Sequence, residues 1–374
     1  MDAKKLFLLG VAALVVLSSA ACGGQWSTEK AWQWYRNVGV IKGCNYLPRT
    51  ATNTTEMWQD DTFAPATIDE ELGWAENLGY NSVRIFMQYL VWEKDRKGFF
   101  SRLDTFLDIA NKHGITAMIV LFDDCAFGYP AKKDPYLGKQ GDPEPGEYAP
   151  YWTPSPGHSR VRDKSRWPLL EKYVKDVVGR FKNDKRVLIW DLYNEPGNAG
   201  MGSESLPLVK KTFEWARSIK PSQPLTTCWW VHELCDVITF HNYANAESMR
   251  NDILKLRKYG RPIMNTEWLL RRGGNTVAEI LPVFEDLCVG WYHWGLVVGR
   301  TQTCMHWSSK KGDPIPENWQ HDIFHSDGTP YRAEENEQLR AFTFGKWKVE
   351  SLSKRATAKI NVSNPEGKLT GDKD

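Results

Sequence analysis

The fold can be inferred first from the segment Val187-Leu188-Ile189-Trp190-Asp191-Leu192-Tyr193-Asn194-Glu195-Pro196. Its first four residues form an apolar run, rich in β-branched side chains, that is typical of a buried strand. Proline has no backbone N–H to donate to a sheet, so Pro196 predicts that the strand ends before it. Asn194 and Glu195 therefore follow the carboxyl end of a strand, where α/β folds place their chemistry.

A second carboxylate occupies the same kind of position further along the chain. The segment Pro262-Ile263-Met264-Asn265-Thr266-Glu267-Trp268 is another apolar run that ends in a glutamate followed by an aromatic residue. Two carboxyl groups delivered by two strand ends are the minimal apparatus for cleaving a glycosidic bond. Glu195 and Glu267 are therefore the first candidates for catalysis.

Strand-like and helix-like periodicities alternate from residue 38 onward, and eight parallel strands separated by helices predict a (β/α)8 TIM barrel. The length of 374 residues suits one such catalytic domain, which we place at residues 22–350. Long loops are expected after the third and eighth strands, at 123–165 and 295–330, and a polar flexible tail at 351–374. The predicted strands are 38–43, 81–86, 115–122, 187–190, 225–230, 237–241, 262–264 and 290–294, and the predicted helices are 68–78, 103–113, 167–181, 206–219, 249–259, 277–287 and 332–342.

The N-terminus is typical of an export signal. Two lysines at positions 4 and 5 precede an apolar stretch from Leu6 to Leu17 that is too short to span a bilayer. Small residues then lead to Cys22, as in a bacterial lipoprotein signal, which predicts a signal peptide at 1–21 and lipidation of Cys22. Ser19 stands where such signals usually have leucine, so ordinary cleavage remains an alternative. We expect an exported protein, either a cell-envelope lipoprotein (periplasmic or at the cell surface) or a secreted protein.

Composition narrows the range of partners. The formal net charge is only +2, which favours neither nucleic acid nor an anionic membrane as a partner. A lipid anchor on Cys22 would be the only membrane contact. The chain holds 18 Trp, 14 Tyr and 15 Phe, and aromatic rings pack both on sugar rings and within protein cores. A carbohydrate partner fits this composition, and the oligomeric state stays open.

Several motifs together resemble the clan A barrel glycosidases, and most closely glycoside hydrolase family 5. Asn194-Glu195-Pro196 on the fourth strand and Glu267 on the seventh are joined by Arg84 at the end of the second, His241-Asn242-Tyr243 at the end of the sixth, and Trp294 on the eighth. The resemblance covers roughly residues 35 to 345. It implies a retaining glycoside hydrolase in which Glu195 is the general acid/base and Glu267 the nucleophile.

The same resemblance suggests roles for residues around the two glutamates. Arg84 would keep Glu267 ionised, and Tyr243 would hydrogen-bond to it. Asn194 would bind the sugar hydroxyl beside the reacting carbon, and Trp294 would form the floor under the sugar. Further candidates for substrate binding are His241, Asn45 and Trp229, although loop hydrogen bonds or core packing explain the latter two equally well.

Asp123 and Asp124 directly follow the third strand, where the resembled family often has histidine. A carboxylate can accept hydrogen bonds from two sugar hydroxyls at once, so a binding role is plausible. The two aspartates would serve equally well to order the long loop. This departure leaves the sugar undefined.

Two hypotheses explain the cysteines, a metal site and a disulfide. Cys228, His232 and Cys235, with His241 nearby, are the ligand types of a zinc site, but Cys228 lies within the predicted fifth strand. A Cys228–Cys235 disulfide suits an exported protein better than zinc. The family chemistry requires neither a metal nor another cofactor, so we expect none.

The functional prediction is a retaining glycoside hydrolase acting on plant or microbial cell-wall-type glycans. The two long aromatic loops favour an exo-acting pocket over an open cleft. The alternatives are an endo-acting β-glucanase, mannanase or xylanase, an arabinofuranosidase or galactofuranosidase, a transglycosidase, and a non-catalytic sugar-binding barrel.

Overall fold

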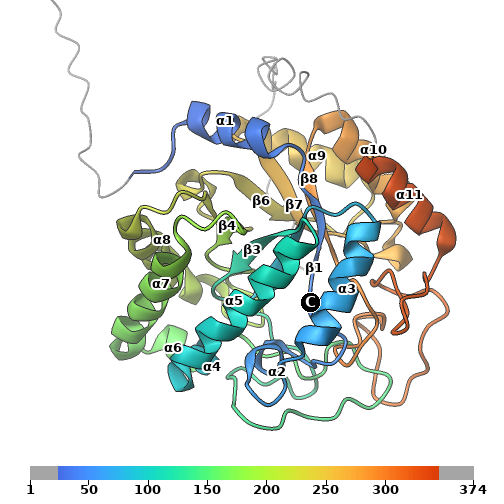
Figure 1. Ribbon diagram of the computed structural model, residues 1–374, viewed down its shortest axis with the longest axis horizontal. Helices are drawn as coiled ribbons and strands as arrows, with labels where there is room; N and C mark the ends of the chain where they lie inside the picture. The colour runs from blue at the N-terminus through green and yellow to red at the C-terminus, as the bar shows by residue number, and fades with distance from the viewer. Residues whose placement is uncertain (1–23, 345–374) are drawn as a thin grey trace, which may run out of the picture.

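Eight parallel strands surrounded by helices form a nearly closed barrel in the computed structural model, which describes residues 24–344 (Figure 1). The strand order is β5-β4-β3-β2-β1-β8-β7-β6, so the sheet opens only between β5 and β6. The strands are β1 (Lys42–Asn45), β2 (Ser82–Phe86), β3 (Thr116–Val120), β4 (Val187–Asp191), β5 (Leu225–Thr226), β6 (Ile238–His241), β7 (Ile263–Glu267) and β8 (Gly290–Trp294). The predicted (β/α)8 fold is confirmed.

The seam between β5 and β6 is narrow. The backbone N–H of Asp236 donates to the carbonyl of Leu225 at 2.8 Å, and the hydroxyls of Thr226 and Thr239 are 2.9 Å apart. One backbone bond and one side-chain bond thus connect the two edges where β5 is too short to form a ladder with β6. The predicted fifth strand ran to residue 230, but the structure ends it at Thr226, and the residues beyond form a loop at the site.

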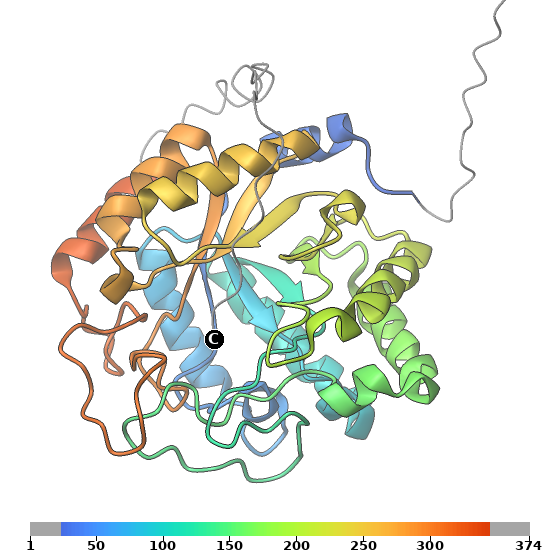
Figure 2. The same ribbon diagram turned by 180° about the vertical axis from the view of Figure 1, so that it is seen from behind.

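Helices cover the outside of the barrel, as Figures 1 and 2 show from opposite sides. Three of them, α7, α8 and α10, begin and end where the sequence predicts. The helices are α1 (Thr28–Val38), α2 (Thr54–Trp58), α3 (Pro65–Asn77), α4 (Tyr89–Lys94), α5 (Arg96–Lys112), α6 (His158–Arg162), α7 (Trp167–Phe181), α8 (Leu206–Ile219), α9 (Ala246–Leu256), α10 (Val277–Leu287) and α11 (Ala333–Phe344).

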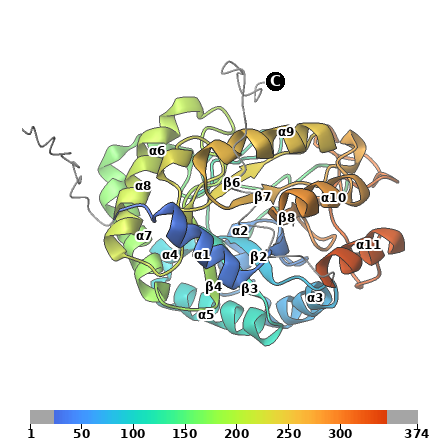
Figure 3. The ribbon, with the colours of Figure 1, turned by 90° about the horizontal axis from the view of Figure 1, so that it is seen from above.

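Helix α1 lies across the end of the barrel at which the strands begin (Figure 3). Its buried Tyr35 packs in one cluster with Ile41, Met118, Ile189 and Met264, which plug that end of the barrel. The predicted first strand, 38–43, is wrong for residues 38–41, because β1 begins at Lys42. Val38 ends α1, and Gly39 takes a φ of +79° that caps the helix and turns the chain toward β1.

The two long loops meet each other above the opposite end of the barrel. The backbone N–H of Gly312 donates to the carbonyl of Pro145 at 3.0 Å, and Gln302 bonds to the backbone on both sides of Pro145. Figures 1 and 2 both show the loops side by side along one edge. We call this joined segment, residues 139–152 and 300–313, the loop wall.

The loop wall is also tied to the loop that follows β1. The side chain of Asn53 donates to Gln140 Oε1 and to the carbonyl of Tyr151, both at 2.8 Å. Loops after β1, β3 and β8 thereby form one continuous structure over the β8–β1–β2–β3 side of the barrel. The loops after β4, β5 and β6 lie on the other side.

Some predictions fall on residues outside the described range. These are the signal peptide at 1–21, the lipidation of Cys22, and the tail at 351–374. Among residues 24–344, no helix has the length and apolar character needed to cross a membrane.

Candidate active site

Glu195 stands four residues after β4 and is held by three side chains, one from its own loop and two from other segments. Its Oε1 lies 2.6 Å from Nδ1 of His241, and its Oε2 lies 3.1 Å from the thiol of Cys125 and 2.5 Å from the amide nitrogen of Asn198. Only 8% of the residue is exposed. The carboxyl group is therefore nearly enclosed, with a defined partner for each oxygen.

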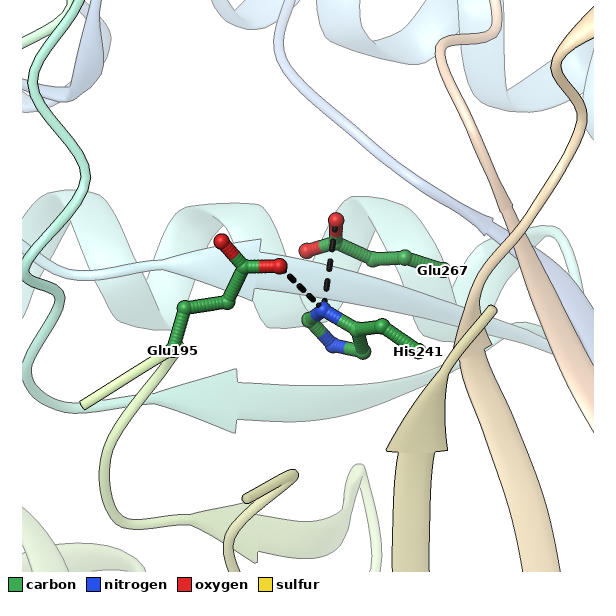
Figure 4. Close-up of side chains that lie close together, drawn as sticks. All are labelled: Glu195, His241 and Glu267. Atoms are coloured by element: carbon green, nitrogen blue, oxygen red, sulfur yellow. Dashed lines mark hydrogen bonds and ion pairs between the residues drawn. The ribbon is translucent and has the colours of Figure 1, made fainter. Parts of the chain in front are cut away.

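Glu267 is the last residue of β7 and lies opposite Glu195 (Figure 4). Its Oε1 accepts a hydrogen bond from Arg84 Nη1 at 2.9 Å, and its Oε2 accepts one from the Tyr243 hydroxyl at 2.9 Å. The residue is 6% exposed. A guanidinium and a phenol thus both stabilise its charged form.

Arg84 occupies the centre of the barrel mouth and has no exposed surface. Its guanidinium bonds to Asp191 Oδ2 at 2.7 and 3.0 Å, to Asn194 Oδ1 at 2.6 Å, to Asn45 Oδ1 at 2.7 Å and to Glu267. These carboxylates raise the pKa of Arg84 despite the opposing effect of burial, so it stays charged. The ends of three strands, β1, β4 and β7, deliver the atoms that surround this one cation.

His241 ends β6 and lies between the two glutamates, as the dashed lines in Figure 4 show. Its Nδ1 is 2.6 Å from Glu195 Oε1 and 3.4 Å from Glu267 Oε2. Burial lowers the pKa of His241 to about 3, so the ring is neutral at pH 7. It carries a single ring proton and adds no charge to the pair.

Burial raises the pKa of both glutamates above their ordinary value. At Glu267 the nearby Glu195 carboxylate adds to the rise, whereas Arg84 and Tyr243 oppose it. Two negative charges this close cannot both be favourable, so the pair retains a proton into the neutral range. Arg84 directly contacts only Glu267 of the two, which places the charge on Glu267 and the proton on Glu195.

Asn194 and Asp123 form a chain of hydrogen bonds beside Glu195. The Asn194 amide donates to Asp123 Oδ1 at 2.9 Å, and Asp123 Oδ2 accepts from Nε1 of Trp152 at 2.8 Å. Burial raises the pKa of Asp123 to about 7. Asp123 therefore orients Asn194 and anchors the loop wall through Trp152.

Asp124 and Asn45 are turned toward protein rather than toward the site opening. Asp124 is fully buried and accepts hydrogen bonds from Tyr193 at 2.7 Å, from the Gly197 N–H at 2.7 Å and from Ser205. Asn45 donates to two backbone carbonyls and accepts from Arg84. Their polar atoms are taken up by structural bonds, which is the alternative that the sequence left open for both.

Trp294 lies at the end of β8 with Phe86 and Trp152 packed edge-on against it, each at a centroid distance of 5.6 Å. A cavity beside these rings is also lined by Asn45, Thr303 and Asp322. Trp294 is therefore placed on the same side of the site as the loop wall.

Two further aromatic groups flank the carboxylates. Trp229 makes an edge contact with His241 at a centroid distance of 6.1 Å, and the adjacent Trp230 is 39% exposed. On the opposite side Trp307 is 49% exposed and contacts Tyr243 at 5.1 Å. Aromatic surface is thus present on both the Glu195 side and the Glu267 side.

Four residues that contact the site were not predicted from the sequence: Asp191, Cys125, Cys228 and Asn198. Asp191 carried a usable signal, since an aspartate inside an otherwise apolar strand requires a buried partner. Asn198 follows Glu195 by three residues, a spacing that permits a local contact. Neither cysteine carried any comparable signal.

The proposed Cys228–Cys235 disulfide is wrong, because Cys228 and Cys235 are both free thiols. The alternative of a zinc site at Cys228, His232 and Cys235 is not supported either. Cys228 Sγ accepts the backbone N–H of Glu195 at 3.1 Å, and Nε2 of His232 lies near the carbonyls of Cys228 and Thr239. Within residues 24–344 the one group near enough to ligate a metal is Glu195, His241 and Glu267. The absence of a metal stays a prediction.

The fold and the paired carboxylates at the strand ends define a (β/α)8 barrel of the glycosidase type. The sequence model of the family described as cellulase (glycosyl hydrolase family 5) matches residues 43–228. No curated protein sequence matches the chain. The protein is a clan A glycoside hydrolase with a family 5-like barrel.

Solved structures with this fold include a mannanase and a mannosidase. An endo-β-1,4-mannanase from Thermotoga petrophila has a TM-score of 0.54 at 15% identity, with 82% of this chain and 77% of that chain covered. An exo-β-1,4-mannosidase from Opitutaceae bacterium strain TAV5 has a TM-score of 0.57 at 15% identity, with 85% and 60% covered, so less than two thirds of that longer chain is matched. A GH5_18 protein from Streptomyces cattleya, in complex with GlcNAc, has a TM-score of 0.53 at 11% identity, with 82% of both chains covered.

Proposed function

We propose that the protein is a retaining, exo-acting glycoside hydrolase that removes single sugars from the non-reducing ends of cell-wall-type glycans. The observation that supports a retaining mechanism is the short distance between the carboxyl groups of the two glutamates. One oxygen of each carboxylate lies within 4.8 Å of the other. Retaining enzymes hold their carboxyl groups about 5–5.5 Å apart, whereas inverting enzymes need roughly 6.5–9.5 Å to admit a water molecule.

In the first step of this mechanism, a Glu267 oxygen forms a bond to the anomeric carbon while the bond to the leaving oxygen breaks. Glu195 gives its proton to that leaving oxygen. In the second step Glu195, now a carboxylate, takes a proton from water as the water oxygen attacks the anomeric carbon and the bond to Glu267 breaks. Each step leaves Glu195 in the protonation state that the next one requires.

Arg84 and Tyr243 support the first step by stabilising Glu267 as an anion before it attacks. Asn194 is oriented by Asp123 and Arg84, which suits it to bind the hydroxyl next to the reacting carbon. Contacts to that hydroxyl strengthen in the transition state. Trp294 supplies the apolar floor under the sugar ring.

The position of the loop wall supports the proposal of exo action at the non-reducing end. The leaving group must extend toward Glu195, because Glu195 protonates its oxygen. The sugar that reacts with Glu267 then lies on the side of Trp294, where the loops after β1, β3 and β8 are joined. If the loop wall closes that side after one sugar, cleavage releases monosaccharides.

We further propose β-mannosides as the first substrates to test, because the solved structures with this fold include a β-mannanase and a β-mannosidase. A shared fold at such identities does not select the sugar. The test panel therefore holds β-mannosides, β-glucosides, β-xylosides, arabinofuranosides and galactofuranosides, each as an aryl glycoside and as an oligosaccharide.

The deciding experiment follows turnover of this panel by the mature protein, with Glu267→Gln as the blank. We expect turnover that disappears in the variant, a first-formed product with the substrate's anomeric configuration by NMR, and monosaccharide as the sole early product. Inverted product would refute retention, and mixed oligosaccharides would refute exo action. Sugar binding without turnover would favour a non-catalytic barrel, and sugar-to-sugar transfer at high sugar concentration would favour a transglycosidase.

Export and a lipid anchor on Cys22 are also proposed, on the residues of the signal alone. Mass spectrometry of the mature N-terminus in the native host tests this proposal. A diacylglyceryl group on Cys22 is expected, whereas an unmodified N-terminus would indicate ordinary cleavage.

A further inference from the structure

The two oxygens of Glu195 have different surroundings. Oε2 lies within hydrogen-bond distance of two donors, the thiol of Cys125 at 3.1 Å and the amide of Asn198 at 2.5 Å. Oε1 faces Nδ1 of His241 at 2.6 Å. A carboxyl oxygen that accepts two hydrogen bonds is the poorer site for a proton. The asymmetry therefore distinguishes the oxygen that accepts from the oxygen that can carry hydrogen.

The Cys125 thiol is fixed as a donor to Glu195. The residue is 5% exposed, and burial raises the pKa of its thiol well above the ordinary value, so it keeps its hydrogen. Asn194 Nδ2 lies 3.5 Å from the sulfur, and the Cys125 backbone N–H donates to Asp123 at 2.9 Å. Because the Asn194 amide approaches the sulfur as a donor, the hydrogen of the thiol is directed to Glu195 Oε2.

The backbone of Glu195 is also held by a sulfur atom. Glu195 has a φ of +40°, which is unfavourable for a residue with a side chain. Its N–H donates to Cys228 Sγ at 3.1 Å, and Cys228 is fully buried. Because such strain persists only when the surroundings impose it, the orientation of this carboxyl depends on contacts from the loops after β3 and β5.

We propose that Cys125 is a positioning residue that, together with Asn198, occupies Oε2 of Glu195 and thereby assigns the proton given to the leaving group to Oε1. This inference rests on the proposed role of Glu195 as the general acid/base. In the acid form the proton on Oε1 is shared with the neutral ring of His241 until the leaving oxygen takes it. Water returns a proton to Oε1 in the second step, so the cycle closes.

The titratable and charged groups around Glu195 come from five elements of the barrel. Their effects on Glu195 oppose one another, since burial raises its pKa while the bonds from Cys125 and Asn198 and the charge of Arg84 lower it. The groups are Arg84 on β2, Cys125 after β3, Cys228 after β5, His241 on β6 and Glu267 on β7. Removing the Cys125 bond changes one of these contributions and leaves the charges in place.

The test compares Cys125→Ala, which removes the donor, with Cys125→Ser, which keeps one. A hydrogen bond to the charged form lowers a carboxyl pKa, so its loss raises the pKa of Glu195. Activity requires Glu195 protonated and falls as pH rises through that pKa. We expect the basic limb of kcat/KM in Cys125→Ala to move up by roughly half to one pH unit, and in Cys125→Ser to stay near wild type.

A second readout varies the leaving group, using methyl and 2,4-dinitrophenyl glycosides of the sugar that the panel identifies. A methoxide leaving group needs the proton, whereas dinitrophenolate leaves without it. Cys125→Ala is expected to lose about tenfold on the methyl glycoside and to change little on the dinitrophenyl glycoside. Cys235→Ala, which removes another fully buried thiol, should match wild type on both.

The possible outcomes test the role of Cys125 separately from the acid/base role of Glu195. Equal pH limbs and equal leaving-group dependence for Cys125→Ala and wild type, with Glu195→Gln impaired on the methyl glycoside, would overturn the inference alone. A Glu195→Gln variant that is unimpaired on the methyl glycoside would overturn the acid/base assignment itself. A Cys125→Ala variant that loses activity equally on both substrates would show a merely structural role and would also overturn the inference.

Discussion

At the residue scale, one buried cation organises the active site. Arg84 is shared between Asp191, which lies deeper on β4, and Glu267 at the site opening. Two carboxylates beside one buried guanidinium share a single positive charge, so neither carboxylate receives the full stabilisation of that charge. The negative charge of Asp191 therefore limits how strongly Arg84 favours the ionised form of Glu267.

The substitution Asp191→Asn tests this division of charge. Without the negative charge of Asp191, the charge of Arg84 stabilises the Glu267 carboxylate more strongly. The pKa of Glu267 is therefore lowered. The nucleophile must be ionised, so activity is lost as pH falls through that pKa. We expect the acidic limb of kcat/KM to move down by about half to one pH unit. A limb that stays fixed or moves up would contradict this; Asp104→Asn, an equal charge change at a surface ion pair, is the control.

At the element scale, the short loop after β5 presents an exposed tryptophan beside the acid. Trp230 has a φ of +51° and Val231 a φ of +23°, two consecutive strained residues. The Trp230 ring lies over Gly197, where a Cβ would come within 2.9 Å of the indole. Strain that holds an exposed indole against the Glu195 loop fits a binding surface for the leaving sugar, with Trp229 behind it.

Trp230→Ala should therefore weaken only reactions that have a sugar as leaving group. We expect kcat/KM to fall about tenfold on an oligosaccharide and to stay within twofold on a glycosyl fluoride, because fluoride cannot contact the ring. Trp307→Ala, which alters the opposite side of the site, should affect both substrates to the same extent. Equal losses in Trp230→Ala on both substrates would refute the assignment.

The loop after β8 contains a buried acid whose charge is costly. Burial raises the pKa of Asp322 to about 7, although Thr303 donates to it at 2.9 Å. A folded-state pKa above the unfolded value means that the folded protein binds the extra proton, so stability falls as pH rises from about 4 to 7. Asparagine keeps the hydrogen bond and tolerates the φ of +54° at this position.

We accordingly expect Asp322→Asn to raise the thermal unfolding midpoint at pH 8, by a few degrees, and to raise it less at pH 5. Thermal scans of both proteins at the two pH values measure this. A gain that is independent of pH would mean that the titration of Asp322 does not control stability in this loop.

At the scale of the whole molecule, the loop wall joins the long loops after β3 and β8 above the barrel. Beyond the backbone contacts, Arg300 pairs with Asp142 at 3.2 Å and Lys311 with Glu144 at 3.2 Å. These ion pairs are exposed and individually weak, so Gln302 contributes more to joining the two loops. The barrel below does not depend on these contacts, since its core lies beneath the strand ends.

Loosening the loop wall should change the products more than the stability. In the double variant Gln302→Gly with Arg300→Ala, glycine suits the φ of +57° at position 302 and leaves the backbone unstrained. We expect a higher ratio of oligosaccharide to monosaccharide products and faster amide exchange at residues 139–147. Monosaccharide as the sole product, despite faster exchange, would show that the loop wall does not set exo action. Lys139→Ala, which removes only a pair within one loop, is the control.

Strand ends were predictable from the sequence, and so were the side chains that they carry. Glu195, Glu267, Arg84 and His241 were placed together because the carboxyl ends of parallel strands meet on one face of a barrel. Cys125 and Asn198 were not placed, because they reach Glu195 from loops whose path no periodicity describes. Catalysis by the two glutamates remains a prediction that the proposed experiments test.

The eight-stranded barrel, and the face on which its polar strand ends meet, can both be predicted from local patterns in the sequence. The partners of the adjacent Asp123 and Asp124, in contrast, depend on the three-dimensional arrangement of the loops. In an extended segment neighbouring side chains point to opposite sides, so Asp123 turns to Asn194 and Trp152, whereas Asp124 turns to Tyr193 and Ser205. Hydrophobic period and proline position are local properties that the sequence records, whereas the partner of a loop side chain depends on which segments the closed barrel brings together.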